Sequence, residues 1–467
     1  MAITTTAEIA QRLTANSSML TTHATDANIA IGNSSLDAIA GNGGACNIAI
    51  GKSALSAATD NCDNIAIGQS ALAASANDGD NNIAIGKTAM GGADVSGAGN
   101  IAIGTTAMDA LTSGTCNIAI GTNAATASVT SGNTIAIGES AFAVSTGGAS
   151  DNIAIGRTAM GGADVSGHDN IAIGKTTMDA LTSGACNIAL GINALGAATD
   201  NNDNIAIGRN ALAVSANDGD QNIAIGLTAM GCADVSAFYN IALGVEAMRC
   251  VTSGTQNIAL GTNTMDGALT GDHNIAMGQN AFGALTCGAC NVAIGENALG
   301  ASTTGCRNIA IGELALGCCT LGGSTSQGNY NHAIGASSLS KMTTGSFNVA
   351  VGTSAMCEAL TGTYNVAIGI TAMGGSNVQG ANNIGIGTNA ADALLTGACN
   401  IALGINALGA ATNNTDNIAI GRSALAASVD DGDNNIAIGL TAMGAADVSG
   451  ANNIALGTTS MLSLIHI

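Results

Sequence analysis

The chain has 467 residues, a formal net charge of −21 and very few aromatic residues: four Phe, three Tyr and no Trp. This composition argues against ordinary globular domains, whose cores depend on aromatic area. The excess of acids argues against nucleic-acid partners, which need clustered Lys and Arg. Because no run of eighteen apolar residues occurs, we predict no membrane-spanning segment and no membrane partner.

The first 27 residues differ from the rest of the chain. Within residues 7–20, Ile9, Leu13 and Leu20 are spaced as on one face of a helix, so residues 1–27 are predicted to cap the first repeat or to form a short trimerising segment. The opening Met-Ala-Ile-Thr-Thr-Thr lacks the basic stretch and apolar run of a secretory signal. We therefore expect the protein to stay in the cell that makes it or to leave by another route, such as within a virus particle.

From residue 28 to residue 461 the sequence consists of one short repeat. The phrase Asn-Ile-Ala-Ile-Gly, or a close variant, occurs 25 times, mostly at intervals of 17 or 18 residues. The one long interval, of 23 residues, separates Asn308 from Asn331. A short unit repeated many times indicates a solenoid, in which each coil buries its apolar side chains against its neighbours.

Each unit predicts one short strand followed by a corner. In Ile-Ala-Ile the first and third side chains lie on one face and Ala on the other, and we expect the larger side chains to be buried. The Gly that follows is present in all 25 copies, which indicates a positive φ or a close backbone approach. Two residues later stands Ser, Thr or Asn in 23 copies, before a small residue and a Leu, Met or Phe. This pattern predicts a short helical turn, with a second strand as the alternative.

Together these features predict a β-solenoid, that is, a parallel β-roll or β-helix of about 25 coils of 17–18 residues. Each coil contributes one short strand plus a short helical turn or a second strand, and like residues stack on like. We expect the Asn side chains to hydrogen-bond along the stack. At about 4.8 Å per coil, the predicted array is a rod of roughly 120 Å.

The phrase Asn-Ile-Ala-Ile-Gly-x-[Ser/Thr/Asn]-Ala-[Leu/Met] resembles the repeats of phage tail-fibre and other virion fibre proteins, and more distantly those of trimeric autotransporter adhesin heads. The bends at 303–308, 343–348 and 360–365, with Thr-Gly before the motif Asn, are most similar to the fibre form. The resemblance covers residues 28–461 and implies a homo-oligomeric, commonly trimeric, fibre. One departure is Ile or Val where the fibre repeats carry Thr, which makes the strand more apolar.

The last six residues, Leu462-Ser-Leu-Ile-His-Ile467, break the repeat without any capping pattern. They match the translation of a widely used transposase sequencing adapter. We therefore interpret residues 462–467 as an artefact at a truncated C-terminus and expect the protein to continue beyond Met461.

The sequence predicts no catalytic site, no metal site and no cofactor. The pairs Cys287/Cys290 and Cys318/Cys319 have no second pair at zinc-ribbon spacing. The histidines are scattered over distant coils, and His332 replaces an Ile that we expect to be buried, so we interpret it as a local core defect. Five of the thirteen cysteines precede a motif Asn in repeats that are never adjacent, and we interpret these as small buried or half-buried fillers: Cys46, Cys116, Cys186, Cys290 and Cys399.

Three acidic bends, at residues 77–82, 217–222 and 430–435, carry oxygen ligands at alternate positions. Ca²⁺ favours such donors, but none of the bends is a complete calcium-binding loop. We therefore interpret them as solvated turns.

One column of side chains is aromatic. Tyr330, Phe347 and Tyr364 precede consecutive motif Asn residues, Arg307 holds the same position one coil earlier, and Tyr239 holds it elsewhere. On a parallel ladder these side chains stack about 4.8 Å apart, beside the 23-residue coil, whose extra loop would shape a groove. We hypothesise a glycan-binding patch at Arg307, Tyr330, Phe347 and Tyr364. The alternative is that the rings only cover the bend and stack on one another.

The leading interpretation is a structural or adhesive fibre shaft of a virion or cell surface, with a cell-surface glycan as ligand and copies of itself as partners. The alternative is an ice-binding or other ligand-binding solenoid. Ice binders present flat ladders of outward Thr, whereas the outward strand residues predicted here are Asn and Ala. An enzyme on this fold would need a carboxylate or basic cluster on one face, which the sequence does not show.

Overall fold

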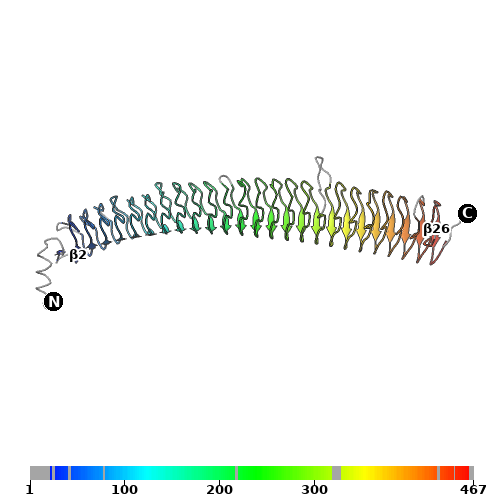
Figure 1. Ribbon diagram of the computed structural model, residues 1–467, viewed down its shortest axis with the longest axis horizontal. Coiled ribbons are helices and arrows are strands. Elements are labelled where there is room, and N and C mark those ends of the chain that lie inside the picture. Colours follow the sequence, from blue (N-terminus) through cyan, green and yellow to red (C-terminus); the bar gives the residue numbers. More distant parts are fainter. Residues whose placement is uncertain are drawn as a thin grey trace, which may run out of the picture. The chain divides into compact units, whose positions relative to one another are not determined.

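The structure is a computed structural model that describes residues 21–23, 27–39, 44–76, 79–215, 219–317, 328–428, 432–445 and 447–461. The helix predicted over 7–20 and the segment 462–467 lie outside this part of the chain. The chain divides into two compact units, Met1–Ser236 and Ala237–Ile467. Each unit is a stack of coils with one short strand apiece, which confirms the predicted β-solenoid (Figure 1).

Every repeat contributes one strand, β2 to β26, and one further strand, β1, precedes the first repeat. The strands of the first unit are β1 (Thr21–His23), β2 (Asn28–Ile31), β3 (Ile48–Ile50), β4 (Ile65–Ile67), β5 (Ile83–Ile85), β6 (Ile101–Ile103), β7 (Ile118–Ile120), β8 (Ile135–Ile137), β9 (Ile153–Ile155), β10 (Ile171–Ile173), β11 (Ile188–Leu190), β12 (Ile205–Ile207) and β13 (Ile223–Ile225). Those of the second unit are β14 (Ile241–Leu243), β15 (Ile258–Leu260), β16 (Ile275–Met277), β17 (Val292–Ile294), β18 (Ile309–Ile311), β19 (His332–Ile334), β20 (Val349–Val351), β21 (Val366–Ile368), β22 (Ile384–Ile386), β23 (Ile401–Leu403), β24 (Ile418–Ile420), β25 (Ile436–Ile438) and β26 (Ile454–Leu456).

Successive strands within each unit pair in parallel and in register. In the first unit Ala172 of β10 lies opposite Ala189 of β11, and in the second Ala402 of β23 lies opposite Ala419 of β24. The exception is β1, which runs antiparallel to β2. It covers the edge of the first coil, whose backbone groups would otherwise be free to pair with another chain.

The motif Asn residues form the predicted hydrogen-bonded column, and they do so inside the coil. Asn187 is fully buried. Its backbone N and its Nδ2 each donate to Oδ1 of Asn170 at 3.0 Å, and Nδ2 also donates to the carbonyl of Asn201 at 2.7 Å. Its own Oδ1 accepts the N–H of Asn204 at 3.0 Å. Asn187 therefore joins three successive coils. At Thr134, where Asn is replaced, the backbone N–H still donates to Oδ1 of Asn117 at 2.9 Å.

The predicted orientation of the strand is wrong: Asn and Ala face inward and Ile faces outward. In β4, Ala66 is fully buried, whereas Ile65 and Ile67 are half-exposed. His332 shares this outward position and is exposed, so it is not a core defect. Strand alternation separates the two faces but does not say which of them the coil encloses.

The interior of the coil is too narrow for Ile on the strand. The Leu, Met or Phe near the end of the turn fills it, as Leu72, Met108 and Phe142 do, each at most 1% exposed. Gly385 replaces the strand Ala, and a Cβ added there would lie 3.0 Å from Cε of Met373. Only a residue as small as Ala fits against the turn side chains.

The Gly corner confirms the expected close backbone approach. Gly51 has φ +135°, and a Cβ at this position would lie 2.5 Å from the carbonyl oxygen of Gly68 in the next coil. A side chain at this corner would push successive coils apart, so Gly recurs at every copy.

The segment after the corner is neither of the predicted forms. Ser53 and Leu55 have φ +56° and +50°, which is left-handed backbone. Ser53 N–H donates to Asn33 in the preceding coil at 2.8 Å, and Leu55 N–H donates to Ala71 in the following coil at 2.9 Å. Ser and Leu rarely adopt this conformation by themselves, and here hydrogen bonds between coils stabilise it. Because the local sequence pattern does not contain these bonds, it predicted a right-handed turn instead.

Two substitutions in β12 test the orientation. Ala206→Asp places a charge in the enclosed interior and is expected to cost several kcal/mol, so the variant should lose a large part of its β signal or of its urea midpoint. Ile207→Asp points out of the coil from a position that is 37% exposed in the single chain, and it should leave the circular dichroism spectrum unchanged. Equal damage by the two variants would contradict the inward-facing Ala.

Candidate ligand-binding site

The aromatic column lies just before strands β19, β20 and β21 in the second unit. Tyr330, Phe347 and Tyr364 have φ values of +58°, +61° and +58°. This backbone turns each ring outward while the Asn that follows turns inward. The three residues are 40%, 44% and 55% exposed.

The rings stack at the spacing that the repeat predicts. The ring centroids of Tyr330 and Phe347 are 4.8 Å apart with an interplanar angle of 8°, and those of Phe347 and Tyr364 are 4.9 Å apart at 2°. The N–H of Phe347 donates to the Asn329 carbonyl and that of Tyr364 to the Ser346 carbonyl, both at 3.1 Å. The ladder of coils therefore positions the rings.

Arg307 continues the column at its N-terminal end. Its Nη1 donates to the Tyr330 hydroxyl at 2.7 Å, and its guanidinium carbon lies 5.3 Å from the centre of the same ring. Such a contact combines a hydrogen bond with cation–π attraction. The predicted set of four side chains is thus brought together.

The stacking limits what the column can bind. Both faces of Phe347 are covered by its neighbours, and Arg307 covers one face of Tyr330. Tyr364 has no ring on its second side, since the next residue in the column is Asn382. A sugar could therefore stack only on the outer face of Tyr364 and reach the hydroxyl edges of the two tyrosines.

Two neighbouring features do not extend this site. Tyr239 contacts Phe238 at 6.5 Å between ring centroids and is separate from the column. The extra loop of the 23-residue coil, residues 318–327, lies outside the described part of the chain, so the predicted groove beside the rings is not seen.

In the described part of the acidic bends, the Asp carboxylates accept hydrogen bonds from the backbone. Asp80, Asp220 and Asp433 each accept a backbone N–H from the preceding coil, at 2.6–2.7 Å. Residues 77–78, 217–218 and 430–431 of these bends lie outside the described part. Among the described residues, no three His, Cys, Asp or Glu side chains gather as a metal site would require.

The five cysteines before the motif Asn are exposed rather than buried fillers, as Cys116 and Cys290 illustrate. The positive φ that turns the rings outward also applies to Cys116, at +57°. These five cysteines are free thiols, while Cys318 and Cys319 lie outside the described ranges.

One partly buried carboxylate has a shifted pKa that bears on stability. Burial raises the pKa of Asp179, and the backbone N–H groups of Gly161 and Gly162 offset only part of this effect. By contrast, hydrogen bonds from Thr146 lower the pKa of Asp164. These contacts join neighbouring coils and form no catalytic pair.

Comparison with known protein families and with curated proteins returns no match to this chain. Among the described residues there is no helix of the length and apolar character needed to span a membrane.

The two shifted carboxyl groups predict opposite pH effects. Because the folded pKa of Asp179 is raised, its ionised form destabilises the fold at neutral pH, and this cost disappears as the pH falls through that pKa. Asp179→Asn should therefore raise the urea midpoint at pH 7 and change it little at about pH 3. The control, Asp164→Asn, should lower the midpoint at pH 7, because a depressed pKa stabilises the fold above it. Shifts of the same sign in both variants would contradict this assignment.

Proposed function

We propose that the chain is a shaft segment of a structural or adhesive fibre on a virion or cell surface, in which copies of the chain pack through their outward Ile columns. The observation that carries this proposal is the apolar outer face of the sheet. Residues in the first and third strand positions are aliphatic in every copy except His332.

The outer face is exposed along each unit. In the first unit Ile103, Ile120 and Ile173 are 36–37% exposed, and in the second Ile368 and Leu403 are 39% and 41% exposed. The other strand Ile side chains of the twelve coils β2–β13 are half-exposed or exposed, so the columns form one extended apolar surface. Large apolar patches of this kind mark interaction sites. A specific interface needs about 800 Å² from each partner.

The properties of this face favour a second copy as the occupant. The columns carry no Asp, Glu, Lys or Arg, whereas the whole chain has a net charge of −21. Another copy presents the same uncharged columns at the same spacing, so the faces can be buried without desolvating a charged group. A trimer, which the fibre resemblance implies, would enclose three such faces.

The expected oligomer is tested by light scattering after size exclusion. Ile103→Asp combined with Ile173→Asp should reduce the mass from a multiple of the chain to one chain, because charges in the interface would be unpaired. Ser113→Asp combined with Ser183→Asp introduces the same charge at exposed bends of the same unit and should leave the mass unchanged. A wild-type chain that elutes as a monomer would overturn the packing proposal.

An adhesive role is supported by the column of Arg307, Tyr330, Phe347 and Tyr364. The open face of Tyr364 and the tyrosine hydroxyls provide a small platform of the kind that holds a sugar, and no other described rings form a stack. The ice-binding alternative has weaker support, since the outward strand face carries Ile and not the Thr ladder of ice binders.

Glycan binding by the column is tested on a glycan array. Tyr330→Ser combined with Tyr364→Ser should abolish binding while the β signal in circular dichroism is retained. Tyr239→Ser removes a ring outside the stack and should have no effect. Retained binding by the double variant, or none by the parent chain, would refute this role without affecting the shaft proposal.

A further inference from the structure

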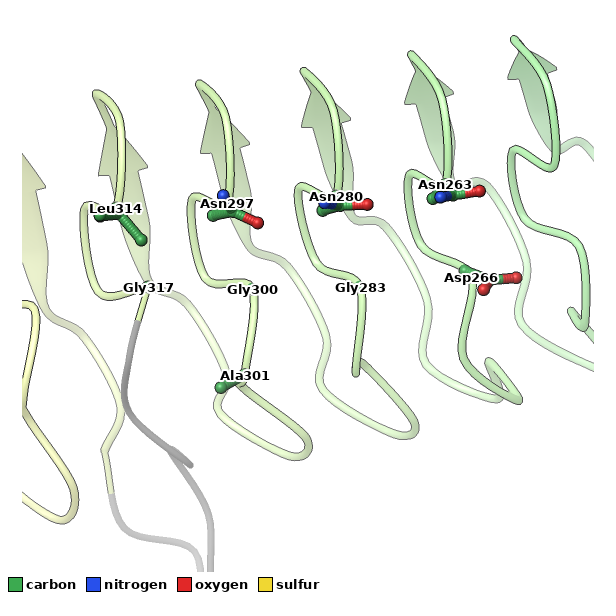
Figure 2. A pocket seen from close by; sticks show the side chains of 9 residues that line it. All are labelled: Asn263, Asp266, Asn280, Gly283, Asn297, Gly300, Ala301, Leu314 and Gly317. Atoms are coloured by element: carbon green, nitrogen blue, oxygen red, sulfur yellow. The ribbon is translucent and has the colours of Figure 1, made fainter.

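A groove lies on the turn surface of the second unit, beside the residues that follow the Gly corners (Figure 2). Asn263, Asn280 and Asn297 form a row along it, one from each coil, and Leu314 continues the row. Gly283 and Gly300 lie below the row. The groove has a volume of about 340 Å³.

The fold does not require a glycine at position 283. A Cβ added to Gly283 would meet its nearest atom, the Asn280 carbonyl oxygen, at 3.4 Å, which is ordinary contact, and its φ is not in the left-handed region. The equivalent position carries Ala143 and Ala213 in other coils. Neither strain nor crowding requires a glycine at position 283, and its missing side chain leaves the groove open.

The amides along the groove are available to a ligand. The side chains of Asn263, Asn280 and Asn297 are half-buried, and no hydrogen bond of the described residues uses their amide groups. At the same position in the first unit, by contrast, the Nδ2 of Asn193 donates to Asn210 at 3.1 Å. Each free amide can both donate and accept, as a hydroxyl-rich ligand requires.

The charges around the groove exclude an anionic ligand. Asp266 stands at one end, where it accepts hydrogen bonds from Arg249 at 2.8 and 3.2 Å, and Glu296 and Glu313 are exposed beside the row. Arg249 is therefore already paired, and the remaining charges are acidic. Like charges at a binding surface are strongly disfavoured, so the ligand is not anionic. The Asn amides of the row, which both donate and accept, suit a neutral hydroxyl-rich ligand.

The same arrangement occurs a second time in this unit. Asn389, Asp392, Asn406 and Gly409 line a groove of about 280 Å³, with the two Asn, the Asp and the Gly in the same places within their coils. It differs in that the Oδ1 of Asn389 already accepts a hydrogen bond from the Thr371 hydroxyl. A Cβ on Gly409 would lie 3.2 Å from the Asn406 carbonyl oxygen, so this position is tighter than Gly283 and the backbone would have to shift by a few tenths of an ångström.

We propose that the Asn263–Asn297 groove binds an extended, uncharged, β-1,4-linked oligosaccharide, with one sugar per coil. Because alternate sugars of such a chain are turned over, the ring hydroxyl or acetamido groups of one sugar and the hydroxymethyl group of the next face the Asn amides in turn. The advance of about 4.8 Å per coil is close to the length of one sugar in such a chain. The inference deepens the adhesive role but uses a surface separate from the aromatic column.

The test is calorimetric titration of the whole chain with cellohexaose, with the hexamer of N-acetylglucosamine and with anionic hexagalacturonate. At least one of the two neutral hexamers should bind, and hexagalacturonate should not. Comparing cellohexaose with the N-acetylglucosamine hexamer distinguishes recognition of hydroxyl groups from recognition of acetamido groups. Gly283→Ser fills the groove and should weaken binding by at least about tenfold. Asn280→Leu, which introduces the residue type of Leu314, should do the same.

Two matched variants separate this site from the rest of the molecule. Ala213→Ser makes a similar change at the same coil position in the first unit. The Tyr330/Tyr364 double Ser variant removes the aromatic column. Both variants should bind the neutral hexamer with the affinity of the parent chain. No binding of either neutral hexamer, or unchanged affinity in Gly283→Ser and Asn280→Leu, overturns the proposal. Loss in the tyrosine variant alone would move oligosaccharide binding to the column and leave the adhesive role standing.

Discussion

The hydrogen bonds of the buried Asn column determine the structure of each coil. An amide in the interior must satisfy both its oxygen and its NH₂ group, and Asn187 does this by bonding to the coil on either side. A buried polar group left unpaired costs about 1–3 kcal/mol. A strand shifted by one residue would move the Asn to the outer face and leave the buried backbone groups that it bonds, such as the Asn201 carbonyl, without a partner. The column therefore enforces the in-register pairing seen throughout each unit.

The orientation of the strand follows from the same constraint. Because Asn faces inward, alternation sends the next residue outward and the Ala after it inward, where it contacts the Leu or Met of the turn. The coil interior is therefore closed by small and polar groups on one wall and by one large aliphatic side chain on the other. The two Ile columns therefore lie on the outer surface, where they are available for contacts between chains.

The sequence alone was sufficient for the repeat, the single strand, the Gly corner, the Asn ladder and the aromatic stack, since each depends on residues recurring at a fixed interval. It was insufficient where the outcome depends on contacts between coils. The inward face of Ile-Ala-Ile depends on how much room Leu72 and its equivalents leave, and the left-handed backbone at Ser53 and Leu55 depends on partners in two other coils. The groove beside Asn280 was missed because Gly283 is unremarkable in a sequence with 66 glycines.

The in-register stacking also bears on how such a gene can change. Each coil presents the same backbone groups to its neighbours on both sides, so the joint between any two coils is interchangeable with any other joint of the same kind. Unequal recombination that adds or removes whole repeats would preserve every ladder contact, whereas a deletion of one residue within a strand would break it. Coil number can therefore vary between generations in whole steps, and natural selection can adjust the reach of the protein without redesigning its core.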